Sequence, residues 1–226
     1  MKVILFGASG MVGQGVLREC LLDPHVTQVL SVVRSPTTQE HSKLIELVRK
    51  DLFAYDDVES QLAGYDACFF CLGVTSSGMT EQEYSHVTYD LTMAAARTLV
   101  RLNPTMTFVY VSGQGTDTSE KGSSMWARVK GKTENALLRL PFKAAYMFRP
   151  GVIQPMHGIQ SKTSSYRVFY AIGKPLLPAL RRLFPQYVTT TELLARAMMH
   201  VAQNGYAKRI LESRDINEAA GATRSS

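Results

Sequence analysis

The sequence contains few cysteines, and they do not form a pattern that binds metal. Of its 226 residues only three are cysteine, at Cys20, Cys68 and Cys71. Cys68 and Cys71 form a Cys-x-x-Cys pair, but no second cysteine pair and no histidine cluster accompanies them, so a zinc site is not expected. Residues three apart in a strand point to opposite faces. We therefore interpret the cysteines as small buried hydrophobic residues.

Long hydrophobic runs and concentrated basic charge are also absent. No apolar stretch approaches the length of a transmembrane helix, and the chain enters a predicted strand at Lys2 without the features of a signal peptide. Lysine and arginine number 25 against 19 acidic residues, a net charge of +6, but they are scattered and form no basic stripe with interleaved aromatic residues. We expect a cytoplasmic protein, a monomer or homodimer, with no transmembrane segment and no nucleic-acid partner.

A glycine-rich turn near the N-terminus is the most informative pattern that is present. It lies between Lys2–Phe6, an apolar run typical of a buried parallel strand, and Met11–Leu22, whose apolar residues have helical spacing. This order presents free backbone N–H groups and the positive helix end to an anion, most often a dinucleotide pyrophosphate. Gly7 would allow the tight turn, Gly10 the close approach of phosphate, and Gly13 the packing of helix on strand; the alternative is a plain structural turn. The predicted pyrophosphate-binding residues are Gly7, Ser9, Gly10, Met11, Val12 and Gly13.

The chain continues with alternating strands and helices, which predicts a Rossmann-like α/β fold with a doubly wound parallel sheet. Further strands are expected at 26–33, 44–50, 67–72, 106–112, 143–148 and 209–211, and helices at 56–62, 81–102, 124–140 and 191–202. A single domain is predicted over 1–226, with its core at about 1–150 and a small irregular C-terminal segment at about 151–220 that covers the substrate. The tail 221–226 is expected to be disordered.

Ligands of such sheets bind at the carboxyl ends of the strands. Arg34 ends the second strand, where an NAD-specific site has an acidic residue, and its guanidinium suits the 2′-phosphate of NADP(H); the alternative is a solvent-facing arginine. Asp51 could accept a hydrogen bond from the adenine amino group or cap the following helix. Gly73 would let the backbone pass close to the adenosine ribose, or simply ends its strand. The predicted adenosine-side residues are Arg34, Asp51, Leu52, Cys71, Leu72 and Gly73.

Several spaced motifs occur in one order along nearly the whole chain. They are the glycine turn, Cys71-Leu72-Gly73, the helix around Val87–Asp90, Val111-Ser112-Gly113, Val129-Lys130-Gly131-Lys132-Thr133-Glu134, Phe148-Arg149-Pro150-Gly151 and Ile210-Leu211-Glu212-Ser213. In these motifs the chain resembles an atypical short-chain dehydrogenase/reductase, and most closely the Tat-interacting-protein oxidoreductase branch. That family contains both working reductases and proteins used mainly as cofactor-dependent regulators.

The resemblance implies roles for the residues that match. It assigns Ser112 to orient the substrate carbonyl, and Lys130 to hold the nicotinamide ribose and to lower the pKa of a tyrosine four residues earlier. The residue at that position is Trp126, whose indole N–H donates a hydrogen bond but is no proton source or sink at physiological pH. The resemblance also brings the backbone of the Arg149-Pro150-Gly151 turn to the nicotinamide amide, where the alternative is a rigid turn. The cofactor residues implied on this side are Lys130, Pro150, Gly151 and Ile153.

The irregular segment offers other acids, namely His157, Tyr166 and Tyr170, each more typical of a packing or surface residue. Tyr170 and Lys174 also form a Tyr-x-x-x-Lys pair, which we interpret as coincidence because Gly173 and Pro175 break any helix there. The stretch 175–184 could be an apolar lid, a dimer contact or a membrane-surface contact.

The sequence thus predicts an NADP(H)-binding reductase that transfers hydride to a small, apolar carbonyl or activated alkene, with NADPH preferred over NADH. Ser112 and Trp126 would donate to the developing oxyanion, Lys130 would fix the ribose, and the proton would come from water or a residue such as Tyr166. The alternative is a catalytically silent NADPH-binding sensor or scaffold, which the tryptophan favours. A nucleotide-sugar epimerase or dehydratase ranks lowest, because such enzymes normally require the same tyrosine.

Overall fold

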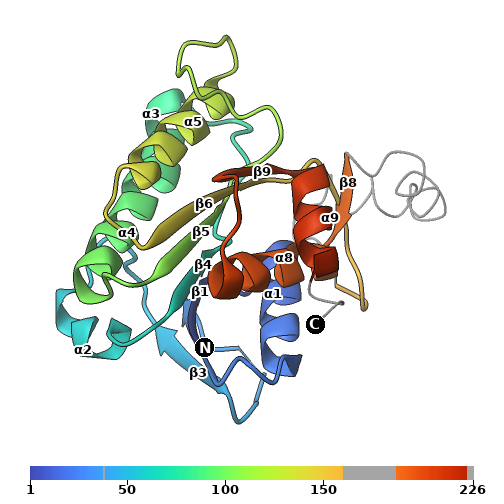
Figure 1. Cartoon of the computed structure of the whole chain (residues 1–226). Coiled ribbons are helices and arrows are strands. Elements are labelled where there is room, and N and C mark those ends of the chain that lie inside the picture. The colour runs from blue at the N-terminus through green and yellow to red at the C-terminus, as the bar shows by residue number, and fades with distance from the viewer. Residues whose placement is uncertain (38, 160–186, 223–226) are drawn as a thin grey trace.

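Seven parallel strands form the central sheet of the computed structural model, which describes residues 1–37, 39–159 and 187–222 (Figure 1). The strand order is β3-β2-β1-β4-β5-β6-β9, so the chain starts in the middle and winds outward in both directions. The strands are β1 (Lys2–Phe6), β2 (Gln28–Val33), β3 (Leu44–Val48), β4 (Ala67–Phe70), β5 (Thr107–Val111), β6 (Ala144–Arg149) and β9 (Ile210–Glu212). The prediction of a doubly wound parallel sheet is confirmed.

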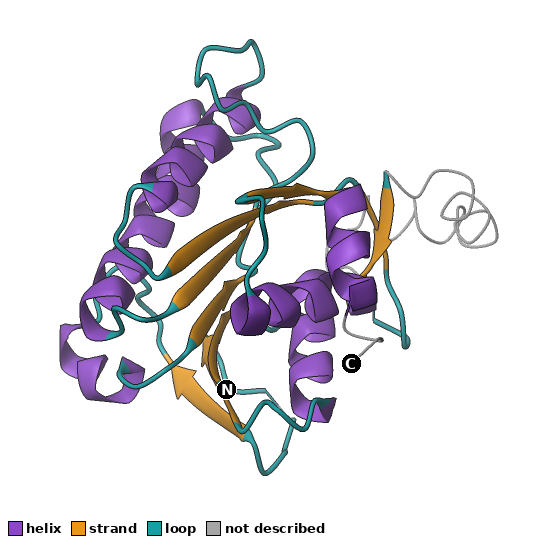
Figure 2. Cartoon of the chain, in the orientation of Figure 1, coloured by secondary structure: helices purple, strands orange, loops and turns teal. Residues whose placement is uncertain are grey.

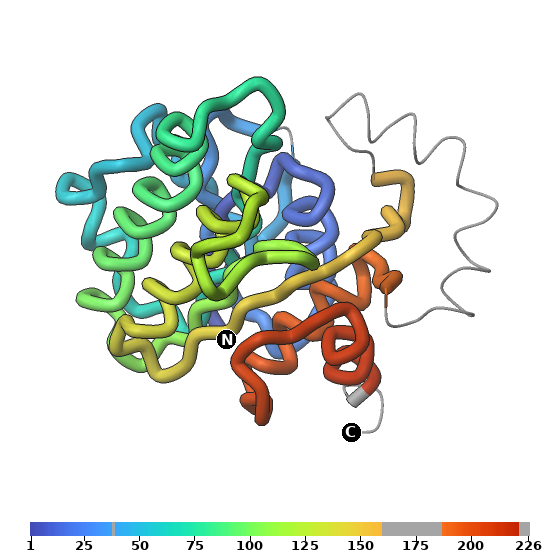
Figure 3. The backbone as a smooth tube through the Cα atoms, turned by 90° about the horizontal axis from the view of Figure 1, so that it is seen from above, coloured from blue at the N-terminus to red at the C-terminus, as the bar shows by residue number. Residues whose placement is uncertain are grey.

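Helices cover both faces of this sheet (Figure 2). They are α1 (Met11–Leu22), α2 (Glu59–Leu62), α3 (Glu81–Ser85), α4 (Leu91–Leu102), α5 (Met125–Leu138), α8 (Thr191–Asn204) and α9 (Ser213–Ala222), with short turns η1 (Asp56–Val58) and η2 (His86–Asp90). Seen from above, the green helices of the middle of the chain and the red C-terminal helix lie on opposite sides of the molecule (Figure 3). None of the helices in the described residues is long and apolar enough to cross a membrane.

The alternating side chains of β1 divide the interior into two hydrophobic layers. Val3 and Leu5 pack with residues of α1, α8 and α9 on one face of the sheet. Ile4 and Phe6 pack with residues of α2, α4 and α5 on the other face. All four side chains are fully buried, because a parallel strand covered by helices on both sides exposes neither face. The carboxyl end of β1, where the glycine turn begins, is therefore held from both sides.

The helix predicted at 81–102 is present with one irregular turn. It begins at Thr80, whose side chain and Glu83 form a reciprocal capping box, and it passes through the π-helical turn η2 into α4. Its last turn ends at Asn103. The side-chain Oδ1 of Asn103 accepts hydrogen bonds from Gly64 N and Tyr65 N, and its Nδ2 donates to Leu62 O and Leu99 O. One asparagine therefore joins the helix end to the loop before β4.

After Gly151 the predicted helix at 191–202 and strand at 209–211 are present as α8 and β9, and the described residues also contain elements that were not predicted. Two short strands, β7 (Val152–Gln154) and β8 (Val188–Thr190), pair in parallel as a second sheet. The helix α9 follows β9 and buries Ile216, Ala219 and Ala220, whose three- and four-residue spacing is a helical signal. Tyr166, Tyr170, Lys174, the stretch 175–184 and most of the tail lie outside the described residues.

Candidate functional site

The glycine turn lies against the end of β4. Gly7 has φ +83°, a conformation that residues with a side chain rarely adopt. A Cβ atom at Gly7 would lie 2.7 Å from the backbone of Cys71 and of Leu72, so the two chain segments touch at this point. Gly10 N donates a hydrogen bond to Gly7 O at 2.9 Å and closes the turn. Both the backbone conformation and the close contact therefore require glycine at position 7.

The first turn of α1 packs on the same loop and leaves its backbone donors available. A Cβ atom at Gly13 would lie 2.0 Å from Gly7 O, so the helix reaches the turn only because residue 13 is glycine. Gly10 is the N-cap, no side chain caps the helix, and its first turn contains no acidic residue. A Cβ atom at Gly10 would have only one neighbour within 4 Å, Gly7 O at 3.4 Å. The fold needs Gly13 but hardly needs Gly10, which fits the predicted approach of a phosphate to the positive helix end.

The residue directly after β2 has a cationic side chain that forms no hydrogen bond or ion pair with the described residues. Arg34 follows Val33 directly and is exposed, and in the described part of the chain its side chain makes no hydrogen bond or ion pair. The next strand is tied to the same point, because Arg49 N donates to Val33 O at 2.7 Å. Arg49 itself pairs with Asp57, whereas the exposed side chains of Arg34 and Lys50 make no hydrogen bond or ion pair in the described part of the chain. Of these two free cations, Arg34 is the one that directly follows β2.

Asp51 forms a local turn after β3. Its Oδ1 accepts a hydrogen bond from Phe53 N at 2.8 Å, and the next helical turn, η1, begins only at Asp56. The interpretation of Asp51 as a helix cap is therefore wrong, and its role at the adenine stays a prediction. Leu52 is buried beside Tyr55 in the core, so only its backbone is available at the surface of the site.

The cysteines take the places that their spacing predicted. Cys68 packs into one hydrophobic layer and Cys71 against the other, and burial raises the pKa of both thiols. No cluster of metal-ligating side chains exists among the residues that the structure describes. Gly73 has open space around its Cα, so the fold places no demand on it.

Lys130 joins α5 to the end of β5. Its Nζ donates a hydrogen bond to the backbone carbonyl of Ser112, the residue that follows β5. Burial lowers the pKa of Lys130 to about 8, and the nearby carboxylate of Glu134 acts in the opposite direction. Trp126 lies one helical turn before Lys130 and is half-buried, with its ring beside Gly115. The structure therefore joins the lysine to the serine that the sequence singled out, and the tryptophan lies one helical turn away on the same helix.

A buried ion-pair network beneath these residues was not predicted from the sequence. Glu134 is fully buried and accepts hydrogen bonds from Ser112 Oγ and, at 3.0 and 3.1 Å, from Arg149 Nε. Arg149 also donates to Thr118 Oγ1 at 2.7 Å. The Ser112 hydroxyl thus donates to Glu134, so its predicted role at a substrate carbonyl requires the hydroxyl to rotate away from that carboxylate. A signal was available in the sequence, since Glu134 lies four residues after Lys130 on one helix face.

The turn after β6 is held from three sides. A Cβ atom at Gly151 would lie 2.4 Å from the Gln114 side chain and 2.6 Å from Tyr187 O. Gly151 N donates to Ser213 Oγ at 2.8 Å, and Pro150 O accepts from Gln114 N at 2.9 Å. This packing fixes the Pro150-Gly151 backbone beside the end of β5, and Ile153 continues from it as a buried residue of β7.

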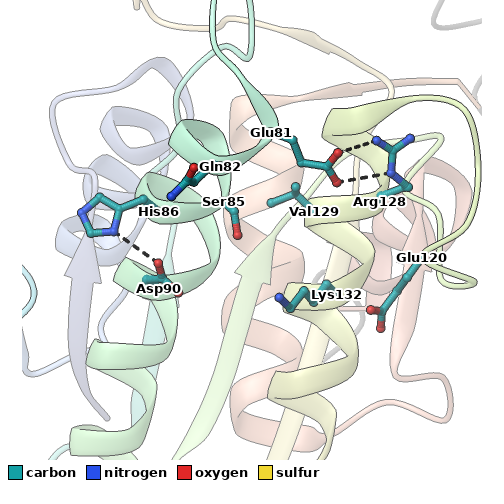
Figure 4. A pocket seen from close by; sticks show the side chains of 9 residues that line it. All are labelled: Glu81, Gln82, Ser85, His86, Asp90, Glu120, Arg128, Val129 and Lys132. Carbon is teal, nitrogen blue, oxygen red and sulfur yellow. Dashed lines mark hydrogen bonds and ion pairs between the residues drawn. The ribbon is translucent and has the colours of Figure 1, made fainter.

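Two surface hollows lie outside this group of residues. One of about 490 Å³ lies between α3–η2 and α5, where Glu81 pairs with Arg128 (Figure 4). A second, between α1 and α8, includes His157, whose ring pairs with Glu192 at 3.2 Å. Of the candidate acids, His157 is thus directed to α8. The first hollow is lined by Glu81, Gln82, Ser85, His86, Asp90, Glu120, Arg128, Val129 and Lys132, none of which is a predicted site residue.

Residues 7–139 match the family model described as NAD(P)H-binding. The match covers more than half of the chain and extends from the glycine turn through α5. The chain belongs to this NAD(P)H-binding family. Its predicted cofactor and catalytic residues up to Lys130 lie inside the matched region, whereas the Arg149-Pro150-Gly151 turn lies beyond it.

Curated relatives of this NAD(P)H-binding chain come from several organisms. Leucinostatins biosynthesis cluster protein T from Purpureocillium lilacinum is 32% identical over 118 residues, which cover 51% of this chain and 44% of that protein. Protein FMP52, mitochondrial, from Meyerozyma guilliermondii is 26% identical over 215 residues, which cover 89% of this chain and 85% of that protein. Protein HTATIP2 from Rattus norvegicus is 28% identical over 154 residues, which cover 67% of this chain and 62% of that protein. The chain thus spans less than half of the first protein and under two thirds of HTATIP2.

Solved structures share the fold of this chain. Gre2 from Candida albicans, in complex with NADPH, superposes with a TM-score of 0.68 at 15% identity, covering 94% of this chain and 78% of that one. The PhqB reductase domain from Penicillium fellutanum has a TM-score of 0.68 at 16% identity, and the superposition covers 93% of this chain and 65% of that one. At these identities the likeness concerns the fold. Together with the family match and HTATIP2, it identifies the chain as an atypical short-chain dehydrogenase/reductase related to the HTATIP2 branch.

Proposed function

We propose that this chain is an NADPH-dependent reductase of a small, apolar carbonyl or activated alkene. The observation that carries the proposal is the position of Lys130, whose ammonium is fixed at the end of β5 by Ser112 O, at the edge of the sheet where the glycine turn ends β1. The two features lie two strands apart at the carboxyl edge of one sheet, which suits the pyrophosphate and the nicotinamide half of an extended dinucleotide. The pyrophosphate would bind at Gly7–Gly13 and the nicotinamide ribose at Lys130.

Arg34 supports a preference for NADP(H) over NAD(H). Its exposed guanidinium has no partner in the described residues, and no acidic residue stands directly at the end of β2 to bind the ribose hydroxyls of NAD. A 2′-phosphate would supply the missing anion and accept two hydrogen bonds from the guanidinium. Asp51 and the backbone of Leu52 and Gly73 would complete the adenosine side.

The chain's own residues would bind, orient and donate. The reduced cofactor, when bound, supplies the hydride. Lys130 would hold the ribose hydroxyls, the backbone of Pro150, Gly151 and Ile153 would meet the nicotinamide amide, and the Trp126 N–H would donate to the substrate oxygen as negative charge develops there. Ser112 would contact the same oxygen if its hydroxyl turns away from Glu134.

A second function, an NADPH-binding sensor or scaffold without turnover, is favoured by one observation. Trp126 occupies the position, one turn before Lys130, where a proton-donating tyrosine is expected from the family resemblance. Such a protein would bind the cofactor and consume none. Binding alone therefore does not separate the two functions, but consumption of NADPH does.

The decisive experiment has two stages. Trp126 is the sole tryptophan, so its fluorescence can be followed during parallel titrations with NADP+ and NAD+, with correction for nucleotide absorption. Saturable quenching at much lower NADP+ than NAD+ is expected. NADPH consumption is then followed with a panel of small apolar aldehydes, ketones and enones. Binding with no consumption across the panel would favour the sensor, and no binding, with calorimetry also silent, would remove the cofactor role.

We further propose that the protein acts in the cytoplasm as a monomer or homodimer. The FMP52 relatives are named as mitochondrial proteins, so the mitochondrion is the competing location. Fractionation of cells expressing the chain with a C-terminal tag separates the two, and recovery with mitochondria would reject the cytoplasmic proposal. Light scattering of the purified protein gives the oligomeric state.

A further inference from the structure

Carbonyl reduction requires a proton as well as a hydride, and the side chains near Lys130 leave few sources. The Trp126 indole does not release a proton near neutral pH. The Ser112 hydroxyl donates to Glu134, and Glu134 is held by the Arg149 guanidinium. Tyr110 is fully buried, and burial raises the pKa of its phenol. Among the described residues, these contacts leave one acid with hydrogens to spare.

That group is the Lys130 ammonium. An ammonium has three N–H bonds, and only the one to Ser112 O has a partner in the described part of the chain. The other two are available on the helix face that also carries Trp126, one turn away. Building on the proposed reductase function, we propose that Lys130 is itself the proton donor to the substrate oxygen, and not only the residue that holds the ribose.

The step balances without a further reactant. Hydride from NADPH forms the new C–H bond, the C=O π electrons move to oxygen, and NADPH leaves as NADP+. One N–H bond of Lys130 breaks, its proton forms the O–H bond of the alcohol, and the electron pair stays on Nζ as a neutral amine. Water then reprotonates the amine while its remaining N–H groups keep contact with Ser112 O and the ribose.

The surroundings of Lys130 make this exchange accessible near neutral pH. Burial lowers the pKa of the ammonium to about 8, and the Glu134 carboxylate limits the decrease. Arg149 faces Glu134 from β6, and Glu212 on β9 lies 3.8 Å from Arg149. On the other packed elements, Tyr110 of β5 and Tyr84 of α3 have pKa values raised by burial and stay neutral. A lysine that gives up its proton near pH 8 is well matched to acid catalysis.

The proposal is tested first by turnover of the carbonyl found in the panel. Lys130→Arg keeps a positive charge and hydrogen-bond donors but cannot release a proton. We expect NADP+ affinity within about fivefold of wild type and kcat lowered about 100-fold or more. Adding Trp126→Tyr to Lys130→Arg supplies a phenol beside a cation. We expect the kcat of this double variant to be at least about tenfold higher than that of Lys130→Arg alone. Lys132→Met, on the far side of α5 over Tyr89, is the control and leaves turnover unchanged.

A second readout does not use turnover. Trp126 fluorescence is measured from pH 6 to pH 10 without cofactor, because the charge on Lys130 lies one helical turn from the indole. We expect a transition with a midpoint near pH 8, absent in Lys130→Met and kept in Lys132→Met. Glu134→Gln removes the charge that raises the pKa of Lys130, so the midpoint moves to lower pH.

The outcomes separate the two proposals. If no carbonyl compound in the panel causes the wild-type protein to oxidise NADPH, the reductase function is rejected and the proton assignment with it. Wild-type turnover that persists within threefold in Lys130→Arg, or a fluorescence midpoint that Lys130→Met does not abolish, rejects only the assignment of Lys130 as acid. Loss of kcat in Lys130→Arg with recovery by the added tyrosine supports both.

Discussion

The Lys130 ammonium donates a hydrogen bond to the backbone carbonyl of Ser112 and so ties the middle of α5 to the end of β5. A single partner for a buried ammonium leaves much of its lost hydration uncompensated. This is the physical reason why the pKa of Lys130 falls to about 8 while it stays beside Glu134. Burial of the lysine at this position is thus a cost to the folded state, which its hydrogen bond to Ser112 O offsets only in part.

Replacing Lys130 with methionine should stabilise the protein at neutral pH. The folded state holds the lysine proton less tightly than the unfolded chain, so the wild type gains stability as the pH rises from about 8 to about 10.5. Lys130→Met should raise the free energy of unfolding at pH 7 by about 1–2 kcal/mol, with the difference shrinking above pH 8. Urea unfolding at pH 7 and pH 10 measures it; a variant less stable than wild type at pH 7 contradicts this account.

Two glycines of the turn should respond differently to alanine. Gly13→Ala places a methyl group 2.0 Å from Gly7 O, so we expect a loss of about 3 kcal/mol in unfolding free energy, and NADP+ binding should be lost with it. Gly10→Ala meets only one atom, at 3.4 Å, and should cost less than about 1 kcal/mol while abolishing NADP+ binding. Thermal unfolding and calorimetric titration of both variants make the comparison. Full NADP+ affinity in Gly10→Ala would show that no phosphate approaches this position.

Arg34→Ala should change cofactor choice. Loss of the guanidinium removes the proposed charge-assisted bonds to the 2′-phosphate, so the Kd for NADP+ should rise about 10- to 100-fold. The Kd for NAD+, which lacks that phosphate, should hardly move. Arg97→Ala, an exposed arginine on α4, is the matched control for loss of one positive charge. Equal weakening of NAD+ and NADP+ in Arg34→Ala would assign this arginine to another part of the cofactor.

Glu134→Gln should be far more damaging than a similar change at the surface. Glu134 is fully buried, and neutralising it leaves the Arg149 guanidinium without its main counter-charge, a loss of about 3 kcal/mol. Glu81→Gln breaks the exposed pair with Arg128 and should leave the denaturant midpoint almost unchanged. Chemical unfolding of the two variants in parallel tests the difference. Similar midpoints would mean that the buried pair contributes no more than the exposed one.

Local patterns were sufficient to predict the frame of the fold. The apolar runs of β1 and β4, the helical spacing of Met11–Leu22 and the alternation of strand and helix each act over a few residues, and each is present in the structure. The strands β7 and β8 were missed, since each is only three residues long and carries little pattern. Both contain β-branched residues, but they become strands by pairing with each other across a long stretch of chain, which no local pattern reveals.

The sequence by itself determined the positions of the glycine turn, Arg34, Lys130 and Trp126, because spacing along a strand or helix decides which side chains share an edge or a face. Tertiary structure alone decided how these positions are used. It requires glycine at positions 7 and 13, because a Cβ atom there would lie 2.7 Å and 2.0 Å from neighbouring backbone atoms. It also turns the Ser112 hydroxyl towards Glu134, which Arg149 of another element holds in place. Burial and pairing depend on which distant segments meet, and that information lies in the packed fold and not in any local run of residues.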